Sequence, residues 1–154
     1  MSQFYFEERE ESAREEIKRA DHLINVSLKY TRTCPVMINA MKRLISAFEM
    51  SFDEYLTFAL TKKKIEEIPQ TAKEKSILIR SLMGKQVVQY IILYNKLIKI
   101  TKASYKSVEE CRKNVTLITL GNDKSIQVNV STLEKYLEET KAFVELVNNI
   151  RKWK

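Results

Sequence analysis

The scarcity of glycine and proline constrains this chain more than any other feature of its sequence. Its 154 residues include 2 glycines and 2 prolines, whereas dinucleotide-binding folds and phosphate-binding loops require glycine where the backbone takes positive φ. The composition therefore argues against such folds and favours long helices. A chain of this length buries about two-thirds of the surface that it exposes when unfolded, so we expect one helical-bundle domain over residues 1–154.

Stretches with apolar residues at steps of three and four predict long helices. The first covers residues 4–32 and contains Ser12 and Glu15 at the spacing of a capping box. The second covers residues 35–64, because Pro35 disfavours helical backbone at the preceding residue and suits a first helical turn. The apolar stripe of the second helix is wide enough to contact more than one neighbour, so we expect it to be central.

A third helical stretch, residues 71–102, opens with Thr71 and Glu74 at capping-box spacing. Gly84 lies in its middle, where glycine costs about 1 kcal/mol relative to alanine, and predicts a kink, a close helix crossing or a break into two helices. From Val87 to Ile100, apolar residues occur on almost every side of the helix. We expect that segment to be either the deepest element or half of a dimer interface.

Between residues 114 and 130 the spacing of the apolar residues changes to every second position. Ile126, Val128 and Val130 alternate with polar residues, and a turn sequence separates them from a preceding stretch rich in β-branched residues. This pattern predicts a two-stranded β-hairpin.

A last helix is predicted over residues 131–152, with Ser131 and Glu134 at capping-box spacing. The expected fold class is therefore all-α: an up-and-down bundle of four main helices with a β-hairpin inserted before the last helix. An isolated hairpin is marginally stable in water, so this one must pack on the bundle or on a second copy.

The charge is unevenly distributed. Lys and Arg number 27 against 20 Asp and Glu, a formal charge of +7. Residues 1–16 contain six glutamates and two arginines, a net −4, so the rest of the chain carries +11. A basic body attracts nucleic acid or another anionic partner, although lysine-rich solvated faces are also common in stable helical proteins.

Basic residues next to aromatic ones could support stacking on nucleic-acid bases. They occur at residues 94–96, at residues 102–106 around Tyr105, and at residues 151–154. The longest apolar run, Tyr90 to Tyr94, is too short to cross a membrane. We therefore expect no membrane partner and a cytoplasmic location.

Catalytic and metal-binding patterns are weak. Cys34 and Cys111 lack CxxC spacing, and His22 is the only histidine, so zinc is not expected. No Glu-x-x-His pattern occurs for a di-metal bundle site. We expect no cofactor, no metal and no catalytic residues; the cysteines are expected to act as small apolar fillers, with a disulfide between them as the alternative.

One local pattern suggests a family. A short segment with Ser107 and Glu110 at capping-box spacing precedes Arg112, Lys113 and Asn114, and a last amphipathic helix follows the hairpin. In this order of elements the chain resembles the HEPN family, helical bundles that often dimerise. In that family an arginine, followed after four to six residues by a histidine, cleaves or binds RNA.

The corresponding positions here hold Leu117, Ile118 and Thr119, none of which transfers protons near pH 7. The resemblance therefore implies a member without the ribonuclease centre. Arg112 is then either a phosphate contact or an ion-pair partner at the end of the bundle. Arg112, Lys113 and Asn114 are the candidate contacts for nucleic acid or another anion.

These observations favour a noncatalytic protein-interaction or scaffold module of HEPN-like type, acting as a homodimer or with a protein partner. The alternative is an RNA-binding or RNA-processing accessory protein that uses the basic surface. A small enzyme whose site carries no recognisable motif is the third hypothesis.

Overall fold

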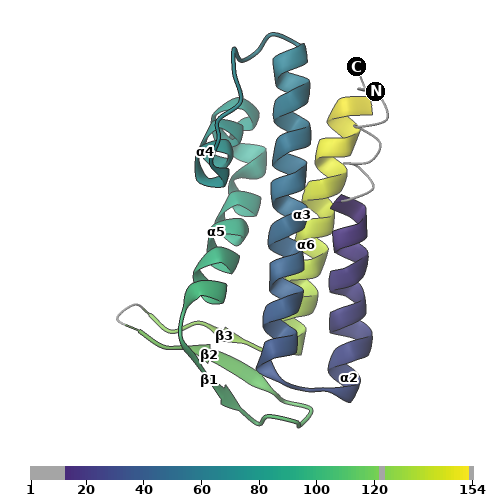
Figure 1. The fold of residues 1–154 in the computed structure, drawn as a ribbon, viewed down its shortest axis with the longest axis vertical. Coiled ribbons are helices and arrows are strands. Elements are labelled where there is room, and N and C mark those ends of the chain that lie inside the picture. The colour runs from purple at the N-terminus through teal and green to yellow at the C-terminus, as the bar shows by residue number, and fades with distance from the viewer. Residues whose placement is uncertain (1–12, 122–123, 153–154) are drawn as a thin grey trace.

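The computed structural model describes residues 13–121 and 124–152. They form helical rods that lie side by side, with a small sheet across one end (Figure 1). The first rod covers residues 13–30. The other three are α3 (Cys34–Thr61), α5 (Val88–Lys102) and α6 (Val130–Lys152). The shorter α4 (Ala72–Met83) and η2 (Gly84–Val87) precede α5, and α4 lies beside the upper end of α5 in Figure 1. Successive rods run in opposite directions (Figure 1), and the predicted mostly helical fold with a small β insertion before the last helix is confirmed.

The first rod contains a feature that the periodicity does not predict. Residues 13–22 are α-helical, but η1 (Leu23–Ser27) is a π-helix, and a last short turn, α2 (Leu28–Tyr30), closes the rod. Ala13, Ala20, Ile24 and Leu28 are buried, which confirms the predicted apolar stripe. The predicted residues 4–12 and the Ser12 cap lie outside the described residues.

The deepest element is α3. It packs against α6, α4, α5 and η1, and every member of its predicted stripe is buried: Met37, Met41, Leu44, Phe48, Ser51, Tyr55 and Phe58. Pro35 lies in the first turn, as expected. The expectation that it disfavours helical backbone at the preceding residue is wrong, because α3 already includes Cys34 and the extended residue is Thr33. The predicted central position of this helix is confirmed.

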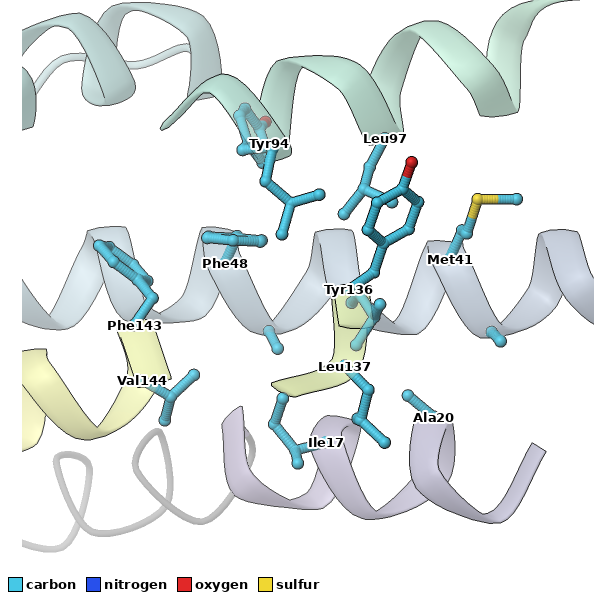
Figure 2. Close-up of a cluster of buried hydrophobic side chains, with 14 of the residues drawn as sticks. Ile17, Ala20, Met41, Phe48, Tyr94, Leu97, Tyr136, Leu137, Phe143 and Val144 are labelled. Atoms are coloured by element: carbon cyan, nitrogen blue, oxygen red, sulfur yellow. The ribbon is translucent and has the colours of Figure 1, made fainter. Parts of the chain in front are cut away.

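Aromatic rings join the rods at the middle of the core. Phe48 of α3 lies 5.7 Å from Tyr94 of α5 and 5.2 Å from Phe143 of α6, measured between ring centroids. Figure 2 shows these rings together with Leu97, and shows Ile17 and Ala20 of the first rod below Leu137 of α6. The core is therefore continuous across all four rods.

Gly84 breaks the third stretch into two helices. Thr71 caps α4, because its Oγ1 accepts a hydrogen bond of 3.2 Å from the backbone N–H of Glu74. Gly84 ends α4 with φ 74° and ψ −148°, a backbone conformation that is essentially restricted to glycine. Of the three outcomes that the sequence allows at this position, the structure has the break.

The apolar segment 87–100 is not the deepest element. Its inner residues, including Leu93, Tyr94, Leu97 and Ile100, are buried, but Ile92 is 61% exposed. The helix α5 therefore lies at the side of α3 with one face exposed to solvent. Nearly all of its apolar residues are buried or half-buried within one copy of the chain.

The β insertion has three strands instead of two. Strands β1 (Tyr105–Val108), β2 (Thr116–Thr119) and β3 (Gln127–Val128) form an antiparallel sheet in that order, with Tyr105 opposite Thr119 and Leu117 opposite Val128. The β2–β3 pair is the predicted hairpin, with shorter strands. The expected capped segment at Ser107 and Glu110 is wrong, because Ser107 belongs to β1 and pairs with Leu117.

The last helix begins one residue earlier than predicted, and its cap differs. Asn129 Oδ1 accepts a 2.9 Å hydrogen bond from the backbone N–H of Thr132, and Thr132 Oγ1 accepts one of 3.3 Å from the N–H of Asn129. This reciprocal pair replaces the predicted Ser131 and Glu134 box, because strand β3 ends directly before Asn129 and fixes where the chain turns.

We expect Gly84→Ala to destabilise the protein by about 1–3 kcal/mol, because an alanine in this conformation is strained. A Cβ built at Gly84 meets nothing within 4 Å, so the effect comes from the backbone alone. Urea unfolding measures it. Ser81→Ala, at an exposed position of α4, is the control and should change the free energy of unfolding by less than about 0.5 kcal/mol. Equal stability of the two variants would contradict the strained conformation.

Candidate functional site

The open face of α5 is basic. Its exposed residues fall on one side of the helix and are Gln89, Ile92, Asn95, Lys96, Lys99 and Lys102. No acidic residue occurs between Glu74 and Glu109, a stretch with six lysines and one arginine. We call Lys96, Lys99, Lys102 and the neighbouring Lys124 the lysine face.

A groove of about 340 Å³ lies where α5 meets the sheet. Lys99, Lys102 and Lys124 line it together with Thr119 and Leu120, and its described lining residues include no carboxylate. Three ammonium groups around one hollow create a positive potential that low-dielectric walls concentrate. The groove can therefore hold an anionic group that bridges the helix and the sheet.

Hydrogen bonds connect the strands that form the sheet side of this groove. The N–H of Leu120 donates to the carbonyl of Ser104 over 2.8 Å. The N–H of Ile126 donates to Thr119 Oγ1 over 2.8 Å, and the N–H of Thr119 donates to the carbonyl of Ile126 over 2.9 Å. These bonds fix the sheet side of the groove.

Helix electrostatics explain part of the lysine face. Lys99 and Lys102 lie in the last turn of α5, where cations offset the negative end of the helix dipole. Lys96 lies further back, with its Nζ 5.9 Å from the ring centroid of Tyr136, and Lys124 belongs to the β2–β3 turn. The dipole does not account for these two lysines, although Lys96 lies within the range of a cation–π contact with Tyr136.

The aromatic residues predicted to stack on bases do not face this groove. Tyr94 is buried, and its hydroxyl donates a 2.7 Å hydrogen bond to Glu49 Oε2. Burial, followed by this contact with Glu49, raises the pKa of Tyr94 above its ordinary value. Tyr105 is half-buried in β1, and Arg151 pairs with Glu54 over 3.2 Å. Residues 153–154 lie outside the described residues.

The residues chosen from the sequence, Arg112, Lys113 and Asn114, lie elsewhere. They are exposed in the loop between β1 and β2, which an antiparallel sheet places at the end opposite to the Lys124 turn. This loop is tied to the bundle by a 2.8 Å hydrogen bond from the N–H of Cys111 to the carbonyl of Arg32. Arg112 lies 3.7 Å from Glu109 in an exposed ion pair, which matches the second of the two roles that the sequence left open.

The three positions that correspond to the histidine of the HEPN pattern lie in a strand. Leu117, Ile118 and Thr119 lie in β2, and Leu117 and Thr119 are buried. His22 lies on the first rod, where its Nδ1 is 3.5 Å from Ser27 Oγ. Within residues 13–121 and 124–152, no group of three or more histidine, cysteine, aspartate or glutamate side chains is placed to hold a metal ion.

The two cysteines differ in environment. Cys34 is buried and accepts a 3.0 Å hydrogen bond from Ser107 Oγ, and burial raises the pKa of its thiol. Cys34 is therefore the small apolar filler that was expected. Cys111 is exposed, so that expectation is wrong for it, and both thiols are free.

Comparison with known proteins gives no relative: no family model, no curated protein and no solved structure matches this chain. Among the described helices, none has both the length and the apolar character of a membrane-spanning segment.

We expect the purified protein to leave RNA intact, because the loop of Arg112 contains no histidine and His22 belongs to another element. A labelled RNA incubated with the protein and a chelator, then separated on a denaturing gel, tests this. Cleavage that disappears in Arg112→Ala would contradict the prediction. Cleavage that disappears in His22→Ala would contradict it too, and would place the reaction on the first rod.

Proposed function

We propose that this chain is a noncatalytic nucleic-acid-binding module that holds a phosphate backbone against the lysine face. The observation that carries the proposal is the grouping of Lys96, Lys99 and Lys102 on the open face of α5 with Lys124 of the β2–β3 turn beside them. Lys99, Lys102 and Lys124 line the groove. RNA is the nucleic acid that the sequence suggested. The proposal favours this alternative over the scaffold function that the sequence placed first.

The side chains of the lysine face suit contact with phosphate groups and do not distinguish one base from another. Lysine is a compact cation on a flexible stem, and Lys96 to Lys102 extend over about 9 Å of helix axis at 1.5 Å per residue. The aromatic rings that could stack on bases near the groove are buried or half-buried. We therefore propose binding with low sequence preference and strong dependence on salt.

The size of the salt dependence follows from the number of contacts. Each phosphate that the protein neutralises contributes about −0.9 to the slope of log K against log salt for a duplex and about −0.7 for a single strand. Four lysine contacts then give a slope of about −3.6 or −2.8.

The second candidate is a HEPN-like scaffold that binds a protein partner or a second copy of itself, and the observation that favours it is the exposed Ile92. In a parallel contact through Ile92, Lys96 and Lys99 come close to their copies, and in an antiparallel contact centred on Ile92, Lys99 comes opposite Lys85 of the copy. Like charges at an interface are unfavourable. The lysine face therefore favours an anionic partner over a homodimer through α5. A cytoplasmic location is part of both proposals.

The triple variant Lys96→Gln, Lys99→Gln, Lys102→Gln tests the first proposal. We expect it to weaken binding of a fluorescein-labelled RNA or DNA duplex by tenfold or more at about 0.1 M salt. The slope should fall in magnitude by about 2.7, because three phosphate contacts are lost. Fluorescence anisotropy between about 50 and 200 mM salt measures both quantities.

The control removes the same charge elsewhere. Lys62, Lys63 and Lys64 are exposed and follow α3 at the end of the bundle away from the sheet (Figure 1), and their change to Gln should weaken binding by less than threefold. Equal losses in the two triple variants would show that binding follows net charge alone and would overturn the proposal. Thermal unfolding by circular dichroism confirms that each variant is folded.

The dimer prediction has its own test. If Ile92 lies in an interface, light scattering of the native protein at tens of micromolar gives the mass of two chains, and Ile92→Glu gives that of one. Since Ile92 is largely exposed within one copy, the substitution should leave the melting temperature of a monomer unchanged. A monomer mass for both proteins would contradict the dimer through this residue.

A further inference from the structure

A second basic hollow lies between the first rod and α3, on the side of α3 away from α5 in the view of Figure 1. It consists of two adjoining parts of about 360 and 390 Å³, which share Leu23 and Arg43 as lining residues. We infer that this hollow is a binding site for the phosphate group of a small phosphorylated molecule. The inference is independent of the lysine face.

Two arginines that line the hollow, Arg19 and Arg43, contact one buried carboxylate. Glu16 is 5% exposed, and its Oε1 accepts a 3.1 Å hydrogen bond from Arg19 Nη1. Arg43 Nη1 lies 3.2 Å from Oε2 and 3.4 Å from Oε1 of the same carboxylate. One arginine would neutralise Glu16, so the second leaves an excess positive charge that is held in a fixed position.

These arginines retain donors for a ligand. A guanidinium has five N–H groups in a rigid fork that matches phosphate oxygens. Arg43 uses one nitrogen on Glu16, and among the described residues its Nε and Nη2 have no acceptor. The side chain is 46% exposed, so these donors are accessible from the hollow.

The π-helix places a third donor beside them. The backbone hydrogen bonds of a π-helix join residues five apart, so such residues lie nearer to each other than in an α-helix, and Ser27 Oγ lies 3.5 Å from His22 Nδ1. When the serine hydroxyl donates to Nδ1, the imidazole proton lies on Nε2. His22 lines the hollow with Arg43, and single π turns within helices occur frequently at functional sites.

The charge of the lining suits one anionic group. Lys18, Arg19, Lys42 and Arg43 face two carboxylates, Glu15 and Glu16, which leaves an excess of about two positive charges. Ligand sites of this size range hold small molecules. Glu15 would repel a long polyanion at the rim, so the chemistry selects a small phosphorylated ligand over a nucleic-acid backbone.

Inorganic pyrophosphate is the probe, followed by nuclear magnetic resonance of the full chain. We expect saturable, one-to-one shifts of the Arg43 Nε–Hε and His22 imidazole signals. The double variant Lys42→Gln, His22→Gln, which leaves the contacts of Glu16 intact, should weaken pyrophosphate binding by about tenfold. Arg43→Lys should also weaken it, because the ammonium keeps a cation near Glu16 but lacks the fork.

Two controls separate this site from the rest of the surface. Arg112→Gln removes an exposed arginine in the β1–β2 loop and should change the affinity for pyrophosphate by less than twofold. The Lys96, Lys99 and Lys102 triple variant should do the same, so this site and the lysine face can fail separately. Chemical shifts that change linearly with pyrophosphate and never saturate would overturn the inference. Equal losses of affinity in Arg112→Gln and in the Lys42→Gln, His22→Gln double variant would overturn it too. Glu16 and its two arginines would then have a structural role only.

Discussion

The contact of Phe48 with the rings of Tyr94 and Phe143 is the interaction on which the rest of the structure depends. It joins α3, α5 and α6 at one level of the core, and each aromatic pair contributes about 0.5–1.5 kcal/mol beyond the area that it buries. Tyr94 also bonds to Glu49 of α3, which fixes the rotation of α5 about its own axis. Because Tyr94 and Leu97 then face inward, Lys96 and Lys99 face outward. The lysine face is a consequence of the way in which the core anchors α5.

Another constraint lies toward the end of the bundle away from the sheet. Glu54 of α3 and Arg151 of α6 form an ion pair of 3.2 Å, and both side chains are largely buried. Removing one partner alone would leave a buried charge, which costs about 3–5 kcal/mol. Ser51 and Asn148 are buried close in sequence to this pair, without hydrogen-bond partners among the described residues. The Glu54–Arg151 pair therefore penalises any shift of α6 along α3 that separates its two members, whereas the apolar stripes alone would tolerate such a shift.

The sequence predicts the features that depend on local interactions. The stripe of α3, the Thr71 cap and the break at Gly84 follow from residues within a few positions of each other. Strand β1 was missed because Tyr105–Val108 is paired by β2, which comes later in the chain. The cap of α6 was misplaced because two capping patterns lie two residues apart, and only the end of β3 decides between Asn129 and Ser131. Lys96 and Lys102 belong to the basic and aromatic segments that the sequence offered, but their common face with Lys99 and Lys124 was missed because it depends on the rotation of α5. The absence of acidic residues between Glu74 and Glu109 was a usable signal.

The two basic surfaces lie on different sides of the hydrophobic core. The lysine face belongs to α5 and the groove beside the sheet, whereas the second hollow lies between the first rod and α3. Neighbouring helix axes are about 8–10 Å apart, and both sets of cations project outward from the bundle. Their separation therefore exceeds the Debye length of about 10 Å at 0.1 M salt. At that ionic strength an anion on one surface has little direct electrostatic effect on the other, and substitutions at the two surfaces should have additive effects.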